Sequence, residues 1–180
     1  MSTNTREIVV EVPSAVKVGM DGKKIWAEKA GHKLEKAFNL TGLKFEKNDK
    51  GVALTIENAN RIRIAGLTSI ATHIRNMVEG LEKGYMYKLV IVFSHFPINI
   101  TQKPGIVEIN NFLGEKQPRI AKVLGKNTVV QVKGKEITVK GNDLDGVSQT
   151  AANLENACRI VIKDSRRFQD GVYIVQKKAQ

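Results

Sequence analysis

Cysteine and histidine are scarce in this 180-residue sequence, which holds one cysteine and three histidines. Structural zinc sites take their ligands mainly from these two residue types at short, regular spacings, and no such spacing occurs here. The single Cys158 falls on the apolar side of a predicted helix. We therefore expect a buried small hydrophobic residue in a reducing compartment, and neither a metal ligand nor a disulfide partner.

Long apolar runs are also absent. No stretch approaches the roughly 18 consecutive apolar residues that would cross a bilayer, and residues 1–6 lack the apolar segment of a secretory signal. The sequence therefore favours a cytoplasmic protein without a membrane partner.

The sequence lacks a recognisable catalytic pattern. Gly125-Lys126 is followed by asparagine, so the phosphate-binding loop of nucleotide hydrolases is missing. Ser94 and His95 are neighbours in a predicted strand, where adjacent side chains point to opposite faces. Asp143 and Asp145 resemble the start of a calcium loop, but its later ligands are missing. We expect no enzymatic activity, no metal and no cofactor.

Charge of one sign dominates instead. The chain has 29 lysines and arginines against 18 aspartates and glutamates, a formal net charge of +11, and its hydrophobic content of 42% is enough for a folded core. Such an excess predicts a polyanionic partner, which is usually nucleic acid or an acidic membrane surface. The alternative is a soluble domain that is basic without such a partner.

The first half of the chain combines period-two strands with one helix. Strands are predicted over 7–13, in hairpins 16–27 and 43–57, and as a third possibility over 61–65; Trp26 is expected in the first core. Apolar residues then recur at helical spacing from Leu67 to Leu81, and Gly84 is placed to end that helix.

The second half predicts more strands before a second helix. A long strand over 85–97, with its run Leu89–Phe93 buried on both faces, is followed by further strands at 98–100, 107–109, 119–123, 128–132 and 136–140. Leu144 to Cys158 has helical spacing, and Asp143 or Asp145 can cap that helix. A buried strand over 159–163, a basic loop and a closing strand from Gly171 follow.

The order of strands, helix and strand occurs twice. Gly84 and Gly171 follow the two predicted helices about half the chain apart, which indicates an internal duplication. We predict an α+β fold with two duplicated domains, 1–88 and 89–180, each a small, mostly antiparallel sheet packed with one main helix.

Cations gather in the second half, on strand ends and in the basic loop. Lysines there can instead guard exposed sheet edges, but that role does not explain Arg166 and Arg167 beside Phe168. The candidate nucleic-acid-binding residues are Lys103, Lys116, Arg119, Lys122, Arg159, Lys163, Arg166, Arg167, Lys177 and Lys178.

Five segments, in this order and spacing, resemble the large-ribosomal-subunit protein L-six family, most closely its archaeal and eukaryotic branch, whose eukaryotic member is called L-nine. The segments are Gly84-Tyr-Met-Tyr-Lys88, His95-Phe-Pro-Ile-Asn99, Asn111-Phe-Leu-Gly-Glu-Lys116, Val147-Ser-Gln-Thr-Ala-Ala152 and Phe168-Gln-Asp-Gly-Val-Tyr173. The sequence departs from the family's usual Gly-Pro-x-Gly turn at Glu28-Lys-Ala-Gly-His32.

The resemblance implies two duplicated α+β domains, no catalysis, and binding to large-subunit rRNA near the sarcin–ricin loop, chiefly by residues 89–180. It also implies neighbouring ribosomal proteins as partners, with translation factors docking nearby. We therefore expect a structural ribosomal protein; the alternative is a nucleic-acid-binding regulator outside the ribosome.

Overall fold

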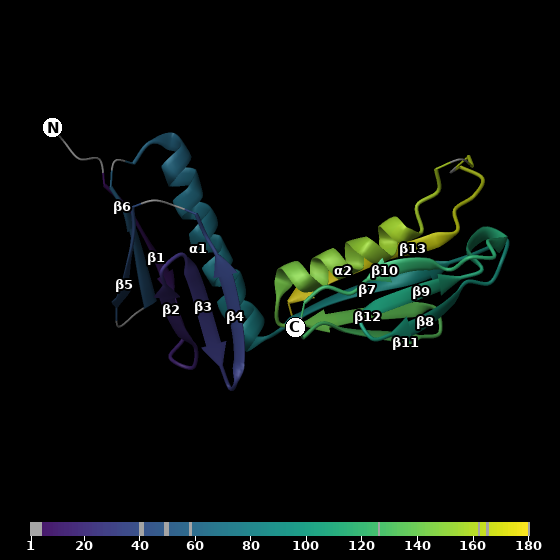
Figure 1. Ribbon diagram of the computed structural model, residues 1–180, viewed down its shortest axis with the longest axis horizontal. Coiled ribbons are helices and arrows are strands. Elements are labelled where there is room, and N and C mark those ends of the chain that lie inside the picture. Colours follow the sequence, from purple (N-terminus) through teal and green to yellow (C-terminus); the bar gives the residue numbers. More distant parts are fainter. Residues whose placement is uncertain are drawn as a thin grey trace. The chain divides into compact units, whose positions relative to one another are not determined.

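The computed structural model describes residues 5–39, 42–48, 51–57, 59–125, 127–161, 163–164 and 166–179, and the chain divides into two compact units (Figure 1). The first unit covers residues 1–82 and the second covers residues 83–180. Each has its own apolar core. In the described part of the chain, no helix is both long enough and apolar enough to cross a membrane.

The first unit contains two antiparallel sheets, ordered β1-β6-β5 and β2-β3-β4, and helix α1, which packs on β1, β3 and β6. Its elements are β1 (Arg6–Glu11), β2 (Lys17–Asp21), β3 (Lys24–Lys29), β4 (His32–Ala37), β5 (Leu43–Asn48), β6 (Gly51–Ile56) and α1 (Arg61–Glu82). Both predicted hairpins are confirmed; β4 was not predicted.

The second unit contains two antiparallel sheets, ordered β11-β12-β7-β13 and β10-β9-β8, and helix α2, which packs on β7, β10, β12 and β13. Its elements are β7 (Tyr85–Val92), β8 (Asn99–Lys103), β9 (Ile106–Asn110), the short 3-10 helix η1 (Phe112–Gly114), β10 (Arg119–Lys122), β11 (Val129–Lys133), β12 (Glu136–Gly141), α2 (Leu144–Ala157) and β13 (Gly171–Ala179).

The two units repeat one topology, so the predicted α+β fold with duplicated domains is confirmed. The antiparallel order β1-β6-β5 recurs as β7-β12-β11, the three-stranded sheet β2-β3-β4 recurs as β8-β9-β10, and a helix follows in each case. Each unit therefore has two small sheets where one was expected. Among the described residues of the first unit, strand β13 has no counterpart.

Gly84 and Gly171, which suggested the duplication, do not occupy equivalent positions in the two units. Gly84 precedes β7 and Gly171 begins β13, and these two strands pair antiparallel within one sheet. The same pairing moves the domain boundary. Because β7 lies between β12 and β13, a boundary at residue 88 would cut a central strand, and the units divide after Glu82 instead.

Helix α1 begins earlier than its apolar pattern predicted. Residues 61–65, expected as a possible strand, form its first turns, because the side-chain oxygen of Asn60 accepts a hydrogen bond from the Arg63 amide at 2.8 Å. Ile62 is consequently 81% exposed. The predicted helical stripe from Leu67 to Leu81 is buried as expected.

Trp26 does not enter the first core. Its neighbours Ile25 and Ala27 on β3 are buried, so alternation places the indole on the opposite face of the sheet. There it covers Gly19 of β2, where an added Cβ would lie 2.5 Å from the ring. A glycine is needed at that position to seat the ring in its present place.

The turn that departs from the family pattern is a tight hairpin between β3 and β4. Ala30 and Gly31 both have positive φ angles, 49° and 82°. A two-residue hairpin turn requires this geometry, which glycine adopts freely and alanine adopts at a cost. The chain thus makes the turn with a strained residue at its first central position.

Helix α2 is capped as predicted, by Asp143 rather than Asp145. The Asp143 carboxylate accepts hydrogen bonds from the amides of Asp145 and Gly146, both at 3.2 Å. Val147 and Leu154 are fully buried against the sheets, and Cys158 follows the helix in the same core. Burial raises the pKa of the Cys158 thiol to about 11, so it serves as an apolar core group.

Two strand predictions in the second unit are wrong. Residues 159–161 and 163 form no strand, and Val161 is 81% exposed; Ile162 lies outside the described residues. Strand β7 ends at Val92, well before Pro97. Val92 is also 40% exposed, because only alternate residues of β7 face the core.

Candidate nucleic-acid interface

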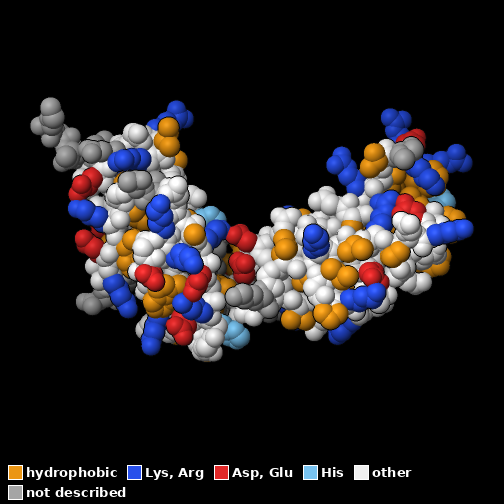
Figure 2. All heavy atoms as spheres, viewed as in Figure 1, with side chains coloured by type: hydrophobic (Ala, Val, Ile, Leu, Met, Phe, Trp, Pro, Cys, Tyr) orange, Lys and Arg blue, Asp and Glu red, His pale blue; other side chains and the backbone are white. Residues whose placement is uncertain are grey.

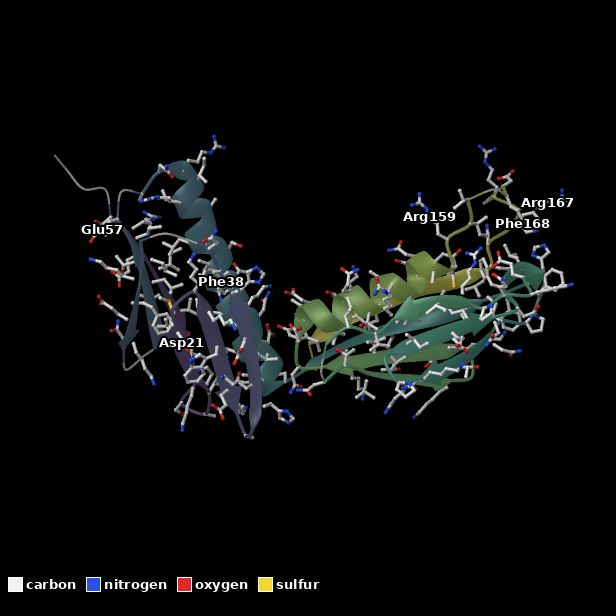
Figure 3. The ribbon with its side chains drawn as sticks, in the orientation of Figure 1. Asp21, Phe38, Glu57, Arg159, Arg167 and Phe168 are labelled. Atoms are coloured by element: carbon white, nitrogen blue, oxygen red, sulfur yellow. The ribbon has the colours of Figure 1, made fainter. Side chains whose placement is uncertain are left out.

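Four of the predicted cations share one connection, which we call the α2–β13 loop, residues 159–170. Arg159, Lys163, Arg166 and Arg167 are all exposed on it. Lysine and arginine side chains project from this end of the unit (Figure 2), and Arg159, Arg167 and Phe168 lie on the loop beyond α2 (Figure 3). The loop therefore presents concentrated positive charge.

Arg119 of β10 holds the start of the loop. Its guanidinium group donates to the carbonyl oxygens of Ala157 and Arg159, at 2.9 and 3.1 Å, and forks onto both carboxylate oxygens of Glu115, at 2.6 and 2.8 Å. It also lies 4.3 Å from the centroid of the Phe112 ring. The hydrogen bonds from Arg119 lower the pKa of Glu115.

The same bonds lie at a turn where a strand was expected. The two carbonyl groups that Arg119 binds are those at the end of α2 and the beginning of the loop. The Arg159 amide donates to the carbonyl of Asn156 in the same turn. Arg119 was predicted to bind nucleic acid; in the structure its guanidinium group is engaged within the fold.

Asp170 holds the end of the loop. Its buried carboxylate accepts hydrogen bonds from the Ser94 amide at 3.0 Å, the Ser94 hydroxyl at 2.9 Å and the His95 amide at 3.3 Å. Burial acts to raise the pKa of Asp170, but the hydrogen bonds from Ser94 and His95 outweigh it and lower that pKa. Asp170 therefore ties the loop to the segment after β7.

Ser94 and His95 were expected on opposite faces of a strand. They are not in a strand, because β7 has already ended. The Ser94 hydroxyl lies 3.3 Å from the His95 Nδ1, and the Asp170 carboxylate lies 3.3 Å from the same nitrogen. A serine-histidine-aspartate relay needs the serine and the aspartate on different ring nitrogens. This cluster cannot perform that relay.

Phe168 joins the aromatic and cationic parts of the loop. Its ring is half-buried, 4.8 Å from the His95 ring centroid to centroid, and the Lys163 Nζ lies 4.7 Å from its centroid. The amides of Arg167 and Phe168 both donate to the carbonyl of Asp164, at 3.1 and 2.9 Å. This turn leaves the two arginine side chains pointing outward while the phenylalanine is held against the unit.

The remaining predicted residues are more dispersed. Lys116 is exposed just before Arg119, whereas Lys103 pairs with Glu108 at 2.7 Å. Lys122 is exposed at the other end of β10. Lys177 lies six residues along β13 from its start, about 20 Å from the loop at strand spacing, and the side chain of Lys178 is outside the described residues.

Sequence reasoning missed a cavity of about 370 Å³ at the base of the loop. The end of α2 contributes Glu155 and Asn156 to its wall, the loop contributes Arg159 and Phe168, and β13 contributes Tyr173. No periodic pattern reveals such a cavity, because its residues come from a helix end, a loop and a strand.

A strongly basic chain with a braced cationic loop is typical of a protein that binds a polyanion. The profile of the family described as Ribosomal protein L6 matches residues 96–171. The large ribosomal subunit protein uL6 of Ignicoccus hospitalis is 41% identical over 175 residues, 94% of each chain. That of Methanospirillum hungatei is 40% identical, covering 98% of this chain and 99% of its own. The chain therefore belongs to the uL6 family of ribosomal proteins.

Family membership confirms the resemblance drawn from the five sequence segments. It also confirms the expectation that the chain is not an enzyme, since uL6 proteins are structural components of the large ribosomal subunit. The similarity extends through both units, because the uL6 protein of Methanosphaera stadtmanae is 35% identical across 96% of this chain.

Proposed function

We propose that the second unit binds large-subunit rRNA through the α2–β13 loop, near the sarcin–ricin loop and the region where translation factors dock. The observation that carries this proposal is the grouping of Arg159, Lys163, Arg166 and Arg167 on one loop fixed at both ends. A loop whose ends are held loses less backbone freedom when its cations meet phosphates, and arginine can fork onto phosphate or stack on a base. The protein would thereby stabilise the folded RNA to which it binds.

The test is binding of the full chain to an RNA fragment containing the sarcin–ricin loop and its flanking helices, titrated with potassium chloride at fixed magnesium. Lys116 and the four loop cations give about five phosphate contacts, so the logarithm of the binding constant should fall against the logarithm of salt with a slope of about −4. A random duplex of equal length is the control. Equal affinity for both RNAs would instead support a general nucleic-acid-binding protein, and a slope near zero would contradict the electrostatic interface.

A further inference from the structure

The cavity at the base of the α2–β13 loop has the features of a site for a single nucleobase. We propose that it takes one unstacked base of the bound RNA. This inference rests on the proposed function, because it assumes that the loop faces RNA. The proposed function involves contacts to the phosphate backbone, and this site would add a contact to a base.

Part of the cavity wall is aromatic and apolar. Tyr173 and Phe168 supply rings, and Ile160 supplies aliphatic surface. The Tyr173 hydroxyl donates to the carbonyl of Gln169 at 3.1 Å, so its ring is held in place while it remains 43% exposed. Unpaired RNA bases are bound in proteins by stacking on rings held in this way.

A small number of polar groups converge on the same space. Glu155 is fixed at the wall because one carboxylate oxygen accepts a hydrogen bond from the Ile174 amide at 3.2 Å. Its other oxygen can accept only, so it can bind an N–H group on the edge of a base, either an amino group or the ring N–H of uracil or guanine. Asn156 supplies an amide, which can both donate and accept.

The cavity opens among the cations of the loop. Arg159 lines it and is exposed, with its backbone held by Arg119, so its planar side chain is available to stack on a base. Lys163 lies over the Phe168 ring beside it. An apolar side chain of a neighbouring protein would use the rings but not this charge, which is why we assign the cavity to RNA.

The first experiment records NMR spectra of the full chain with adenosine 5′-monophosphate, uridine 5′-monophosphate or ribose 5-phosphate. We expect adenosine monophosphate and uridine monophosphate to shift the signals of Tyr173 and Phe168, and ribose 5-phosphate to shift only loop cations. Identical shifts from adenosine monophosphate and ribose 5-phosphate would overturn the proposal.

The second experiment measures binding to the sarcin–ricin fragment by two matched variants. Tyr173→Leu removes the ring but keeps an apolar side chain, and should weaken binding on the order of tenfold; Tyr173→Phe keeps the ring and should bind as the parent does. Equal losses in both would show that the hydroxyl only braces the loop, and no loss in either would exclude the cavity from RNA contact. If the parent prefers the fragment and Tyr173→Leu binds it equally well, only the base site is contradicted. If the parent shows no preference for the fragment, the proposed function itself is contradicted.

Discussion

Arg119 donates a hydrogen bond from its Nη1 to the carbonyl oxygen of Ala157, the last residue of α2, at 2.9 Å. A side chain of the three-stranded sheet thus satisfies a carbonyl group that the helix leaves without an intrahelical partner. The same guanidinium group is engaged by Glu115 and the carbonyl of Arg159. We infer that Arg119 positions the cationic loop that carries the proposed RNA contacts.

Replacing Arg119 by lysine should therefore destabilise the protein. A lysine ammonium group cannot fork onto Glu115 and reach two carbonyls together, so we expect a loss of about 2 kcal/mol, measured by urea unfolding. Lys122→Ala, on the same strand but exposed, is the matched control and should change stability by less than about 0.5 kcal/mol. Equal effects would mean that the Arg119 contacts add nothing specific.

Asp170→Asn should weaken the protein in a pH-dependent way. Because the pKa of Asp170 is lower in the folded state, its carboxylate contributes stability above the unfolded pKa of about 3.9, and this contribution is lost as the pH falls through the folded pKa. The parent should thus exceed the variant in unfolding free energy at pH 7, and the difference should shrink in acid. Urea unfolding of both proteins at pH 7 and pH 3 provides the measurement. A gap of constant size would mean that ionisation of the Asp170 carboxylate does not contribute to stability.

The paired arginines of the loop should contribute more to RNA binding than a paired cation elsewhere. We expect Arg166→Ala with Arg167→Ala to reduce the steepness of the salt slope by about 2, since each arginine is assigned one phosphate. The control is Lys23→Ala with Lys24→Ala, which removes the same charge from the turn and strand of a hairpin in the first unit. Filter binding to the sarcin–ricin fragment across a salt series measures both. Equal slopes for the two variants would mean that the effect depends on the net charge of the protein and not on the position of the arginines.

The position of the domain boundary can be tested with fragments. Residues 83–180 contain all of β7, whereas residues 89–180 keep only half of the strand to which β12 and β13 both pair. We expect the longer fragment to melt cooperatively and the shorter one to lack a cooperative transition. Circular dichroism during heating distinguishes them. A cooperative melt of residues 89–180 would show that the first half of β7 is dispensable.

Ala30→Asn should stabilise the first unit. Asparagine tolerates the positive φ angle of Ala30 better than alanine does, and Asn-Gly is the preferred pair in a two-residue hairpin turn. We expect a gain of about 0.5–1 kcal/mol in the free energy of unfolding. Lys29→Asn, one residue earlier and within the strand, is the control and should bring no gain. A loss of stability in Ala30→Asn would mean that the turn is not strained.

The sequence predicted best where one local pattern met no competing contact. The helical stripe from Leu67 to Leu81 and the cap at Asp143 are decided by spacing and by one side chain, and both are confirmed. The predictions failed where a distant or neighbouring group makes a contact that the local pattern does not contain. Asn60 caps the helix that includes the alternating residues 61–65, and Arg119 binds the Ala157 carbonyl at the turn where a strand was expected.

The candidate site follows the same rule. Composition and the grouping of Arg166 with Arg167 located the cationic loop, because a cluster of charged residues can be recognised in the sequence. The sequence does not give distances between remote segments, so the hydrogen bonds of Arg119 and those between Asp170 and Ser94 could not be predicted. Predicting that Lys177 lies far from the loop would have required the direction in which β13 runs.

The pairing of β13 with β7 also sets an order of events during synthesis. The first unit contains all of its paired strands by residue 82, so it can fold while the rest of the chain is still being made. Strand β7 emerges next, yet one of its edges stays open until the ribosome has added the strand that ends at Ala179. During that interval the unpaired backbone N–H and C=O groups on that edge of β7 can pair with other nascent chains. We conclude that the second unit is the part of this protein most vulnerable to aggregation before it reaches its RNA.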